Sequence, residues 1–524
     1  MPSIQNYRFL FLLLMALEPL CAQKINLSGV IRDAQTGEQL GGATIYEQTT
    51  NKGTTSNNYG FYSLDVSQKD SLQLVLSFLG YKSQTYTLTE KTDQSVDFDL
   101  QPAEWTLEEV ELTAQKVKTI NERIEIGVNS IQTQQIEKLP ALGGEVDLLK
   151  ALQLLPGVQS GNEGTSGLYV RGGSPDQNLM LLDDVPLYYV NHLGGFVSTF
   201  NVDAIKSVKL TKGGFPARYG GRLSSIVDIR MKEGNRKAFK GSGLIGIVAS
   251  KIAIEGPIKK DTTSYILSAR RFLYDLITRP FTKIAFDGIS VGYTFHDINA
   301  KIIHQINKKN QLYFSSFLGN DRSVLRLKGE DFFKNSIQWG NQLAALRWNR
   351  IFGNKLFLNT TLSYTRYRYK TQSKAKGTEV DDSIESVDEF FSGIKDFSVK
   401  MDFEYFVSSQ FKLAFGGQHI DHTFTPGISR FNQKINGEVD EAQTSGSPDY
   451  RAWEQGGYLE NEISLGKGFS ANLGLRYNHF VINQKAYPSL EPRGLVKFSL
   501  GPNSSLKAAY SIMQQNVHLL TSSG

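Results

Sequence analysis

Apolar and polar side chains alternate residue by residue in the stretch Phe469-Ser470-Ala471-Asn472-Leu473-Gly474-Leu475-Arg476-Tyr477-Asn478. Successive side chains of a β-strand point to opposite faces, so this stretch predicts a strand with one apolar and one polar face. The same alternation recurs at 356–365 and 506–511. An apolar exterior and a polar interior are what a lipid-facing antiparallel β-barrel requires. A soluble sandwich would alternate too, but it would hide its apolar face.

Loop lengths favour the same architecture for residues 236–524. Short turns such as Gly353-Asn354 alternate with long polar segments at 372–388 and 433–449. We expect the short turns to face the periplasm and the long segments to face the outside. Aromatic side chains near strand ends are expected at the two membrane interfaces: Tyr367, Tyr369, Tyr405, Phe406 and Phe480.

The segment 236–524 holds about thirteen candidate strands, whereas large plugged outer-membrane transporters have about 22. No terminal strand with a C-terminal aromatic residue precedes Ser523-Gly524. An incomplete barrel would leave unpaired strand edges in lipid, which is costly. The sequence therefore predicts a truncated, partial outer-membrane barrel, with a second chain that supplies the remaining strands as the alternative.

Composition excludes several other classes of protein. The chain has 524 residues, a formal net charge of +5 without a basic block, and one cysteine. Nucleic acid is therefore not an expected partner, and disulfide or cysteine–metal chemistry is excluded if Cys21 leaves with a leader. Residues 1–22 are typical of a signal peptide, with Arg8 before the apolar run 9–17. An N-terminal membrane anchor is a weaker interpretation, because Glu18-Pro19 breaks the apolar run. A lipoprotein is also a weaker interpretation, because Glu18-Pro19-Leu20 before Cys21 is a poor lipobox.

Residues 23–101 show several short β-prone runs separated by turn residues, which predicts a sandwich. The segments Ser28-Gly29-Val30-Ile31-Arg32-Asp33, Gly60-Phe61-Tyr62 and Phe78-Leu79-Gly80-Tyr81 resemble the carboxypeptidase-regulatory-like domain. That resemblance implies a transthyretin-like β-sandwich, often found before the plug of TonB-dependent receptors. It implies no peptidase activity. The chain lacks a His-x-x-Glu metal pair, so we expect no catalytic residues, no metal site and no cofactor.

A polar linker is expected at 102–118. Within it, Glu109, Val110, Glu111, Leu112, Thr113 and Ala114 resemble the TonB box that precedes plugs of this family. A short alternating segment on a flexible linker can add itself as a strand to a partner sheet. An ordinary linker strand remains the alternative.

Residues 119–235 predict a compact α/β unit. Apolar residues at helical spacing in 145–155 end at Pro156-Gly157, and strand-like runs follow at 167–171, 179–182, 204–210 and 224–229.

This unit resembles the plug of TonB-dependent receptors, in the family's order over about 80 residues. The resemblance is carried by Leu154-Leu155-Pro156-Gly157-Val158, Tyr169-Val170-Arg171-Gly172-Gly173-Ser174-Pro175, Leu181-Leu182-Asp183-Asp184-Val185-Pro186 and Gly213-Gly214-Phe215-Pro216-Ala217-Arg218-Tyr219-Gly220-Gly221-Arg222. It makes Arg171, Gly172, Gly173, Asp183, Arg218 and Arg222 the plug motif candidates. Asp184 departs from the family, which usually has glycine there.

Three further patterns suggest other chemistry. Residues 241–246 fit G-x-G-x-x-G, but β-prone residues follow directly, so a barrel strand is favoured over a dinucleotide site. His419 and His422 would point to opposite faces of a strand, so joint metal ligation is not expected. The arginines of the plug, Arg230 included, could form an electropositive lumen; ion pairs between plug and wall are the preferred interpretation.

The resemblance implies a TonB-dependent outer-membrane receptor, mainly β, with its N-terminal domain in the periplasm. It would import a bulky solute (a siderophore, cobalamin, a peptide or a glycan) through energy transmitted by TonB and the inner-membrane energising complex. Expected partners are outer-membrane lipid, the extracellular solute and, in the glycan case, a surface lipoprotein. A non-transporting surface binding protein and a signalling receptor are the alternatives. The sequence leaves the solute open.

Overall fold

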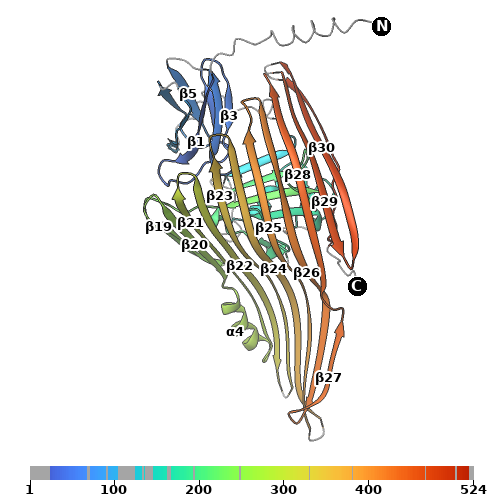
Figure 1. The fold of residues 1–524 in the computed structure, drawn as a ribbon. Helices are drawn as coiled ribbons and strands as arrows, with labels where there is room; N and C mark the ends of the chain where they lie inside the picture. The colour runs from blue at the N-terminus through green and yellow to red at the C-terminus, as the bar shows by residue number, and fades with distance from the viewer. Residues whose placement is uncertain are drawn as a thin grey trace, which may run out of the picture.

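The structure is a computed structural model. It describes residues 24–67, 71–89, 92–103, 124–132, 135, 146–161, 167–192, 195–246, 249–329, 331–379, 382–466, 468–501 and 504–518. The expected signal peptide and the TonB-box-like residues Glu109 to Ala114 lie outside the described residues. The fold is mainly β, as predicted, and its parts are a sandwich, an α/β plug and a large antiparallel sheet (Figure 1).

Two small sheets form the N-terminal sandwich. One contains β1 (Lys24–Asp33), β4 (Phe61–Ser67), β7 (Gln94–Ser95) and β8 (Phe98–Leu100). The other has the order β3 (Gly53–Thr55), β2 (Thr44–Glu47), β5 (Leu72–Ser77) and β6 (Gln84–Leu88). Leu27, Leu64 and Leu74 are fully buried in the shared core.

Strand β4 is buried on both faces. Tyr62 and Leu64 enter the sandwich core. Phe61 points the other way, into a separate cluster with Phe357 and Phe406 of the large sheet. The sandwich is therefore docked against the sheet, and its core does not depend on that contact.

The plug has a five-stranded mixed sheet at its centre. Its order is β13 (Val185–Pro186), β12 (Asn178–Leu182), β17 (Ser225–Met231), β16 (Ile205–Thr211) and β9 (Val128–Gln132). Shorter elements surround it: α3 (Leu148–Gln153), β10 (Val158–Gln159), β11 (Tyr169–Val170), η1 (Pro175–Gln177), β14 (Asn191–His192), β15 (Val197–Ser198) and η3 (Val202–Ala204).

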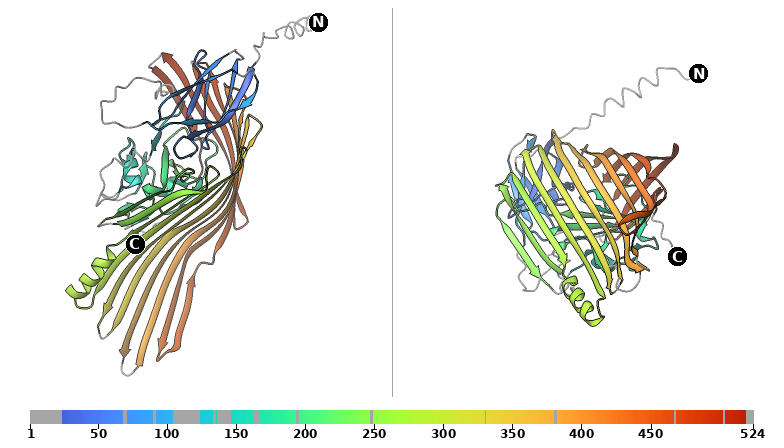
Figure 2. Two further views of the ribbon diagram at one scale, coloured as in Figure 1. Left: turned by 90° about the vertical axis from the view of Figure 1, so that its left-hand side faces the viewer. Right: turned by 90° about the horizontal axis from the view of Figure 1, so that it is seen from below.

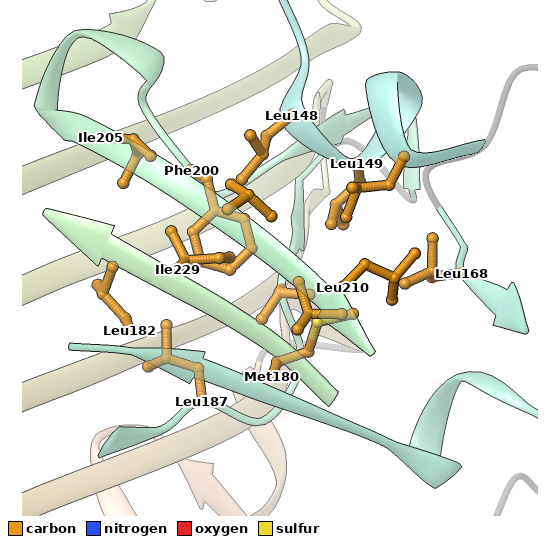
Figure 3. Packing of buried hydrophobic residues seen from close by; sticks show 14 of the residues in the cluster. Leu148, Leu149, Leu168, Met180, Leu182, Leu187, Phe200, Ile205, Leu210 and Ile229 are labelled. Atoms are coloured by element: carbon orange, nitrogen blue, oxygen red, sulfur yellow. The ribbon is translucent and has the colours of Figure 1, made fainter. Parts of the chain in front are cut away.

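Helix α3 covers one face of this sheet. Leu148 and Leu149 pack with Phe200, Leu210 and Ile229 (Figure 3). The Asp147 side chain accepts hydrogen bonds from the backbone N–H groups of Leu149 and Lys150, which satisfies donors that a helix start leaves unpaired. The helix is shorter than the predicted stripe, and Leu148, Leu149 and Leu152 of that stripe are buried.

The large sheet forms a curved wall around the plug (Figure 2). It has 14 strands: β18 (Lys240–Ile245), β19 (Ala249–Lys259), β20 (Thr263–Phe272), β21 (Ser290–Asn307), β22 (Asn310–Lys328), β23 (Phe332–Phe352), β24 (Leu356–Glu379), β25 (Asp382–Phe406), β26 (Phe411–Ile435), β27 (Glu438–Gly446), β28 (Tyr450–Leu465), β29 (Phe469–Ile482), β30 (Lys485–Gly501) and β31 (Ser504–Ser511). Neighbours are antiparallel, and β27 pairs with β26 beside the main path.

The predicted two-faced pattern is confirmed in β29. Leu473 and Leu475 are 51% and 45% exposed, whereas Arg476 and Asn478 are 1% and 0% exposed. The polar side chains therefore face the plug and the apolar ones face away from it. A soluble sandwich would show the reverse.

Two expectations about the wall were wrong. The polar segments 372–388 and 433–449 are not loops, because β24, β25 and β26 continue through them as long hairpins and β27 adds to the edge. The aromatic girdle is also not formed as expected: Tyr367 packs on Tyr189 of the plug, Phe406 on Phe61 of the sandwich, and Phe480 is buried. Alternation of apolar and polar residues shows which side chains share a face of a strand. It does not show what packs against that face.

The sandwich lies at the end of the wall that carries the short turns, and β27 and helix α4 (Asp275–Ala285) lie at the other end (Figure 1). Within the described residues, no helix has the length and apolarity needed to cross a membrane.

Candidate functional site

The plug meets the wall through the two-residue turn between β12 and β13. Asp183 and Asp184 have φ angles of 50° and 68°. Such left-handed residues at both positions are typical of a type I′ turn, which favours Gly, Asn and Asp. Asp184 therefore replaces the family's glycine without breaking the turn, and it adds a carboxylate there.

Asp183 ties the plug to three strands of the wall. Its buried carboxylate accepts a hydrogen bond from Ser315 at 2.8 Å and forms an ion pair with Lys301 at 2.9 Å. Its backbone carbonyl accepts a hydrogen bond from Arg347. Burial alone would raise the pKa of this carboxyl, but Lys301 and Arg347 outweigh it and lower the pKa to about 2.

Asp184 joins the plug to the sandwich. Its carboxylate accepts two hydrogen bonds from Arg230, at 2.9 and 3.0 Å, and one from the Tyr59 hydroxyl at 2.9 Å. Although burial opposes the charged form, Arg230 and the neighbouring cations hold the pKa of Asp184 well below its usual range. Asp184 therefore stays charged and binds Arg230 of the plug and Tyr59 of the sandwich.

A second fully buried charge cluster surrounds His192 of the plug. Its Nε2 lies 2.8 Å from Asp297 and its Nδ1 lies 2.6 Å from Asp321, both on the wall. The ring stacks on Phe295 at 4.1 Å, and Arg270 donates to the same Asp297. Burial lowers the pKa of His192, but the two carboxylates outweigh it and raise the pKa to about 9.

A third group of polar residues lines a cavity between plug and wall. The Tyr188 hydroxyl of the plug donates to Asp396 of the wall, which also contacts His422 at 2.8 Å. Around them the cavity is lined by Arg218, Arg222, Lys400 and Glu454. Both signs of charge therefore face the same space.

The plug motif residues lie in three connections: Arg171 to Gly173 after β11, Asp183 between β12 and β13, and Arg218 and Arg222 between β16 and β17. Arg171 and Gly172 have positive φ angles of 50° and 82°. A Cβ at Gly173 would lie 2.5 Å from the Ser224 side chain, so only glycine fits there. Their functional roles remain predictions.

The predicted ion pairs of the plug arginines are only partly formed. Arg230 pairs with Asp184 and Asp228 of the plug itself, so the expectation of a partner on the wall was wrong for this residue. Arg222 donates to the Gly221 carbonyl, and Arg218 lies over the Tyr219 ring at 4.8 Å. The ion pairs between plug and wall are formed instead by Asp183 and His192 of the plug. Sequence reasoning missed His192, because its partners follow more than 100 positions later.

The G-x-G-x-x-G motif lies in a strand and the two histidines lie on opposite faces, as predicted. Residues 241–245 lie in strand β18, not in a nucleotide-binding turn. His422 is buried against the plug side, whereas His419 is on the opposite, exposed side of β26. In the described part of the chain, no group of three or more histidine, cysteine or acidic side chains is placed to hold a metal ion.

Three family models match successive parts of the chain. The CarboxypepD_reg-like domain matches residues 27–112, the TonB-dependent Receptor Plug Domain matches 121–225, and the TonB dependent receptor-like β-barrel matches 285–512. The order and positions agree with the sandwich, the plug and the wall.

Individual relatives agree with these models. TonB-dependent receptor P3 of Formosa agariphila is 27% identical over 176 residues, which cover 33% of this chain and 17% of that protein. The ferric enterobactin receptor PfeA of Pseudomonas aeruginosa (G324V mutant) has a TM-score of 0.51 at 14% identity, over 74% of this chain and 61% of that one. The outer membrane transporter YddB of Escherichia coli has a TM-score of 0.53 at 12% identity, over 74% and 60%. The chain thus spans less than two thirds of the length of these relatives.

The structural neighbours share the fold of a plug inside a curved sheet, and the three models together account for most of the sequence. These findings imply an outer-membrane location. The chain belongs to the TonB-dependent receptor family.

Proposed function

We propose that this chain acts as an outer-membrane importer of a bulky solute, energised through TonB. The observation that carries the proposal is the polar contact between plug and wall. Charged groups dominate it, at Asp183 with Lys301 and at His192 with Asp297. Polar groups can exchange their partners for water as a plug moves. A wholly apolar contact could not do so without exposing its surface.

The proposed orientation places the sandwich in the periplasm. The sandwich lies beside the short turns at 308–309 and 353–354 (Figure 1). Such barrels have their short turns on the periplasmic side. TonB would then reach Glu109 to Ala114, the segment between sandwich and plug. A short extended segment there can pair with a partner's sheet through backbone hydrogen bonds.

The solute class is proposed from the relatives and from the cavity. One structural neighbour is a ferric enterobactin receptor, which favours an iron–siderophore complex over cobalamin, peptides or glycans. Arg218, Arg222 and Lys400 in the cavity suit the carboxylate or catecholate oxygens of such a complex, and they lie beside the acidic Asp184, Asp396 and Glu454.

A disulfide between plug and wall tests whether the plug must move. A Cβ built on Gly474 lies 2.8 Å from Cβ of Ala217, and disulfides join Cβ atoms about 3.8 Å apart, so a shift of about 1 Å suffices. In cells carrying A217C/G474C we expect uptake of labelled ferric siderophores to stop under oxidation and to return after reduction. Each single-cysteine variant is the control.

The outcomes separate importer from simple receptor. Undiminished uptake with the disulfide formed would contradict plug movement. Surface binding without uptake by the unmodified chain would favour the non-transporting alternative. Deleting 109–114 should abolish uptake and leave surface binding intact, and uptake that survives this deletion would rule out energy transfer through that segment.

A further inference from the structure

The sandwich holds the segment that joins the plug to the wall. Strand β17 of the plug ends at Met231 and β18 of the wall begins at Lys240, so we call residues 232–239 the junction. The turn between β1 and β2 of the sandwich lies against it. Three hydrogen bonds join the two: Glu233 N–H to the Glu38 carboxylate at 2.7 Å, Arg236 N–H to the Thr36 carbonyl at 2.8 Å, and Lys237 Nζ to the Ala34 carbonyl at 2.6 Å.

The wall holds the junction from the other side. The buried Ser264 hydroxyl donates to the Glu233 carbonyl at 2.8 Å. The Asp261 N–H donates to the Arg236 carbonyl at 3.0 Å. The junction therefore lies between the sandwich and the wall, and the end of β17 is held in place while the sandwich is docked.

The sandwich also contacts the plug sheet itself. Glu38 forms an ion pair with Lys206 of β16 at 3.2 Å, and the Tyr59 hydroxyl donates to Asp184 in the turn after β12. Strands β12, β17 and β16 are neighbours in the plug sheet, and their pairing places both contacts and the junction at one end of it. The docked sandwich therefore braces three adjacent strands of the plug at once.

The contacts of the sandwich can be broken without unfolding it. Its core is formed by its own residues, and its contact with the wall includes the rings around Phe61 and the ion pair of Asp65 with Lys355 at 2.9 Å. Polar groups released from such a contact are satisfied by water. The sandwich lies over the plug at one end of the wall (Figure 2), so it can leave that position as a folded unit.

Tension between the sandwich and the plug acts on both of them. Residues 109–114 lie in the sequence between β8, the last strand of the sandwich, and β9, the first strand of the plug. Strand β9 is at the edge of the plug sheet and pairs with β16. A pull at 109–114 thus loads an edge strand of the plug and also the sandwich that braces the strands beyond it.

We propose that the sandwich is a latch on the plug, and that it must detach before the plug can move. A pull that displaced β9 alone would leave β12, β16 and β17 braced at one end. Detachment of the sandwich frees the Asp184 turn, Lys206 and the junction together. The inference rests on the proposed function, since it takes residues 109–114 to be the point at which TonB pulls.

A disulfide between sandwich and junction tests the latch in cells. A Cβ built on Gly37 lies 3.3 Å from Cβ of Arg236, and disulfides join Cβ atoms about 3.8 Å apart. With G37C/R236C we expect uptake of labelled ferric siderophore to stop under oxidation and to return after reduction. Gly37 has a φ of 75°, so the single variant G37C controls for backbone strain and R236C for loss of the arginine.

Comparison with A217C/G474C separates the latch from the proposed function. That disulfide joins plug and wall directly and leaves the sandwich free. If it stops uptake while oxidised G37C/R236C still imports, the importer stands and the latch is overturned. If neither disulfide stops uptake, plug movement is wrong, and the latch is decided by hydrogen exchange in the purified full chain.

Hydrogen exchange measures the brace without transport. The release variant Y59F/E38A removes both direct contacts with the plug sheet. We expect the amides of β12, which neither side chain touches, to exchange about tenfold faster in it. The matched control Y86F/D99A removes the same groups from another part of the sandwich and should exchange like the unmodified chain. Equal exchange of β12 in the release variant and the control would overturn the proposal, even if G37C/R236C fails to fold.

Discussion

Asp184 is a single side chain on which two domains converge. It forms an ion pair with Arg230 inside the plug and accepts a hydrogen bond from the Tyr59 hydroxyl of the sandwich. Glycine at the same position would keep the turn but leave Arg230 buried with only Asp228 as its partner. Removing one partner of a buried ion pair is costly, because the other charge stays buried.

Replacing Asp184 by Asn should therefore lower the free energy of unfolding by about 3 kcal/mol. Asn tolerates the positive φ, so the turn itself survives. Urea unfolding of the full chain in detergent measures the change. Tyr59→Phe serves as the matched control, since it loses one hydrogen bond and should cost about 1 kcal/mol. Equal losses in the two variants would show that the Arg230 pair contributes little.

His192 should make the contact between plug and wall sensitive to alkaline pH. Asp297 and Asp321 raise its pKa from 6.5 to about 9. The stabilisation is therefore fully present below pH 6.5 and is lost as pH rises through 9. The shift corresponds to about 3 kcal/mol. Thermal unfolding between pH 6 and 9.5 should show this loss in the unmodified chain, and His192→Gln should flatten it. Parallel curves would contradict the charged state of His192.

The strands of the wall predict how substitutions on their two faces differ. Leu475 is on the exposed, apolar face of β29, inside the expected lipid belt. Leu475→Arg should cost about 3 kcal/mol in a bilayer, because arginine near the midplane is expensive. Val439 is equally apolar and exposed, but it lies on β27 at the far end of the wall. Val439→Arg should be neutral when both variants are folded into vesicles and titrated with urea. If both substitutions lowered the free energy of unfolding equally, the lipid belt would have to lie elsewhere on the wall.

Strands could be predicted from the sequence where one of their faces is apolar. The prediction failed where neither face is apolar. The run 469–478 alternates apolar and polar residues, and its faces were predicted correctly. In 372–388 and 433–449 both faces are polar, so the pattern looked like a loop although backbone pairing continues. Strand β4 shows another limit: the run Gly60-Phe61-Tyr62 does not reveal that Phe61 packs on a partner outside its own domain.

The three parts of the molecule are stacked so that each contacts the other two. Beyond Tyr59, the Gln39 side chain of the sandwich donates to Gln311 of the wall at 2.6 Å, and Lys206 of the plug donates to the Gln39 carbonyl at 2.5 Å. Family resemblance predicted the parts and their order. It could not predict this docking, because Gln39 and Gln311 are 272 positions apart.

Docking of the sandwich should depend on Phe61. Phe61→Ala empties a site between Phe357 and Phe406, a change that costs about 3–5 kcal/mol in a core. The sandwich itself should stay folded, since its own core is formed by other residues. Hydrogen exchange at residues 353–357 should accelerate in this variant and not in Leu79→Ala, an exposed site on the same domain. Unchanged exchange would mean that the turn is protected without the sandwich.

The docked arrangement also constrains the order of folding. The ribosome makes the sandwich and the plug before any strand of the wall, so the partners of Tyr59, Asp183 and His192 on the wall are absent when these segments emerge. Contacts this distant in sequence form slowly, because a long loop must close before they give any stability. During that interval Phe61 and the charged turn of the plug stay uncovered, which favours capture by a holding chaperone over spontaneous collapse.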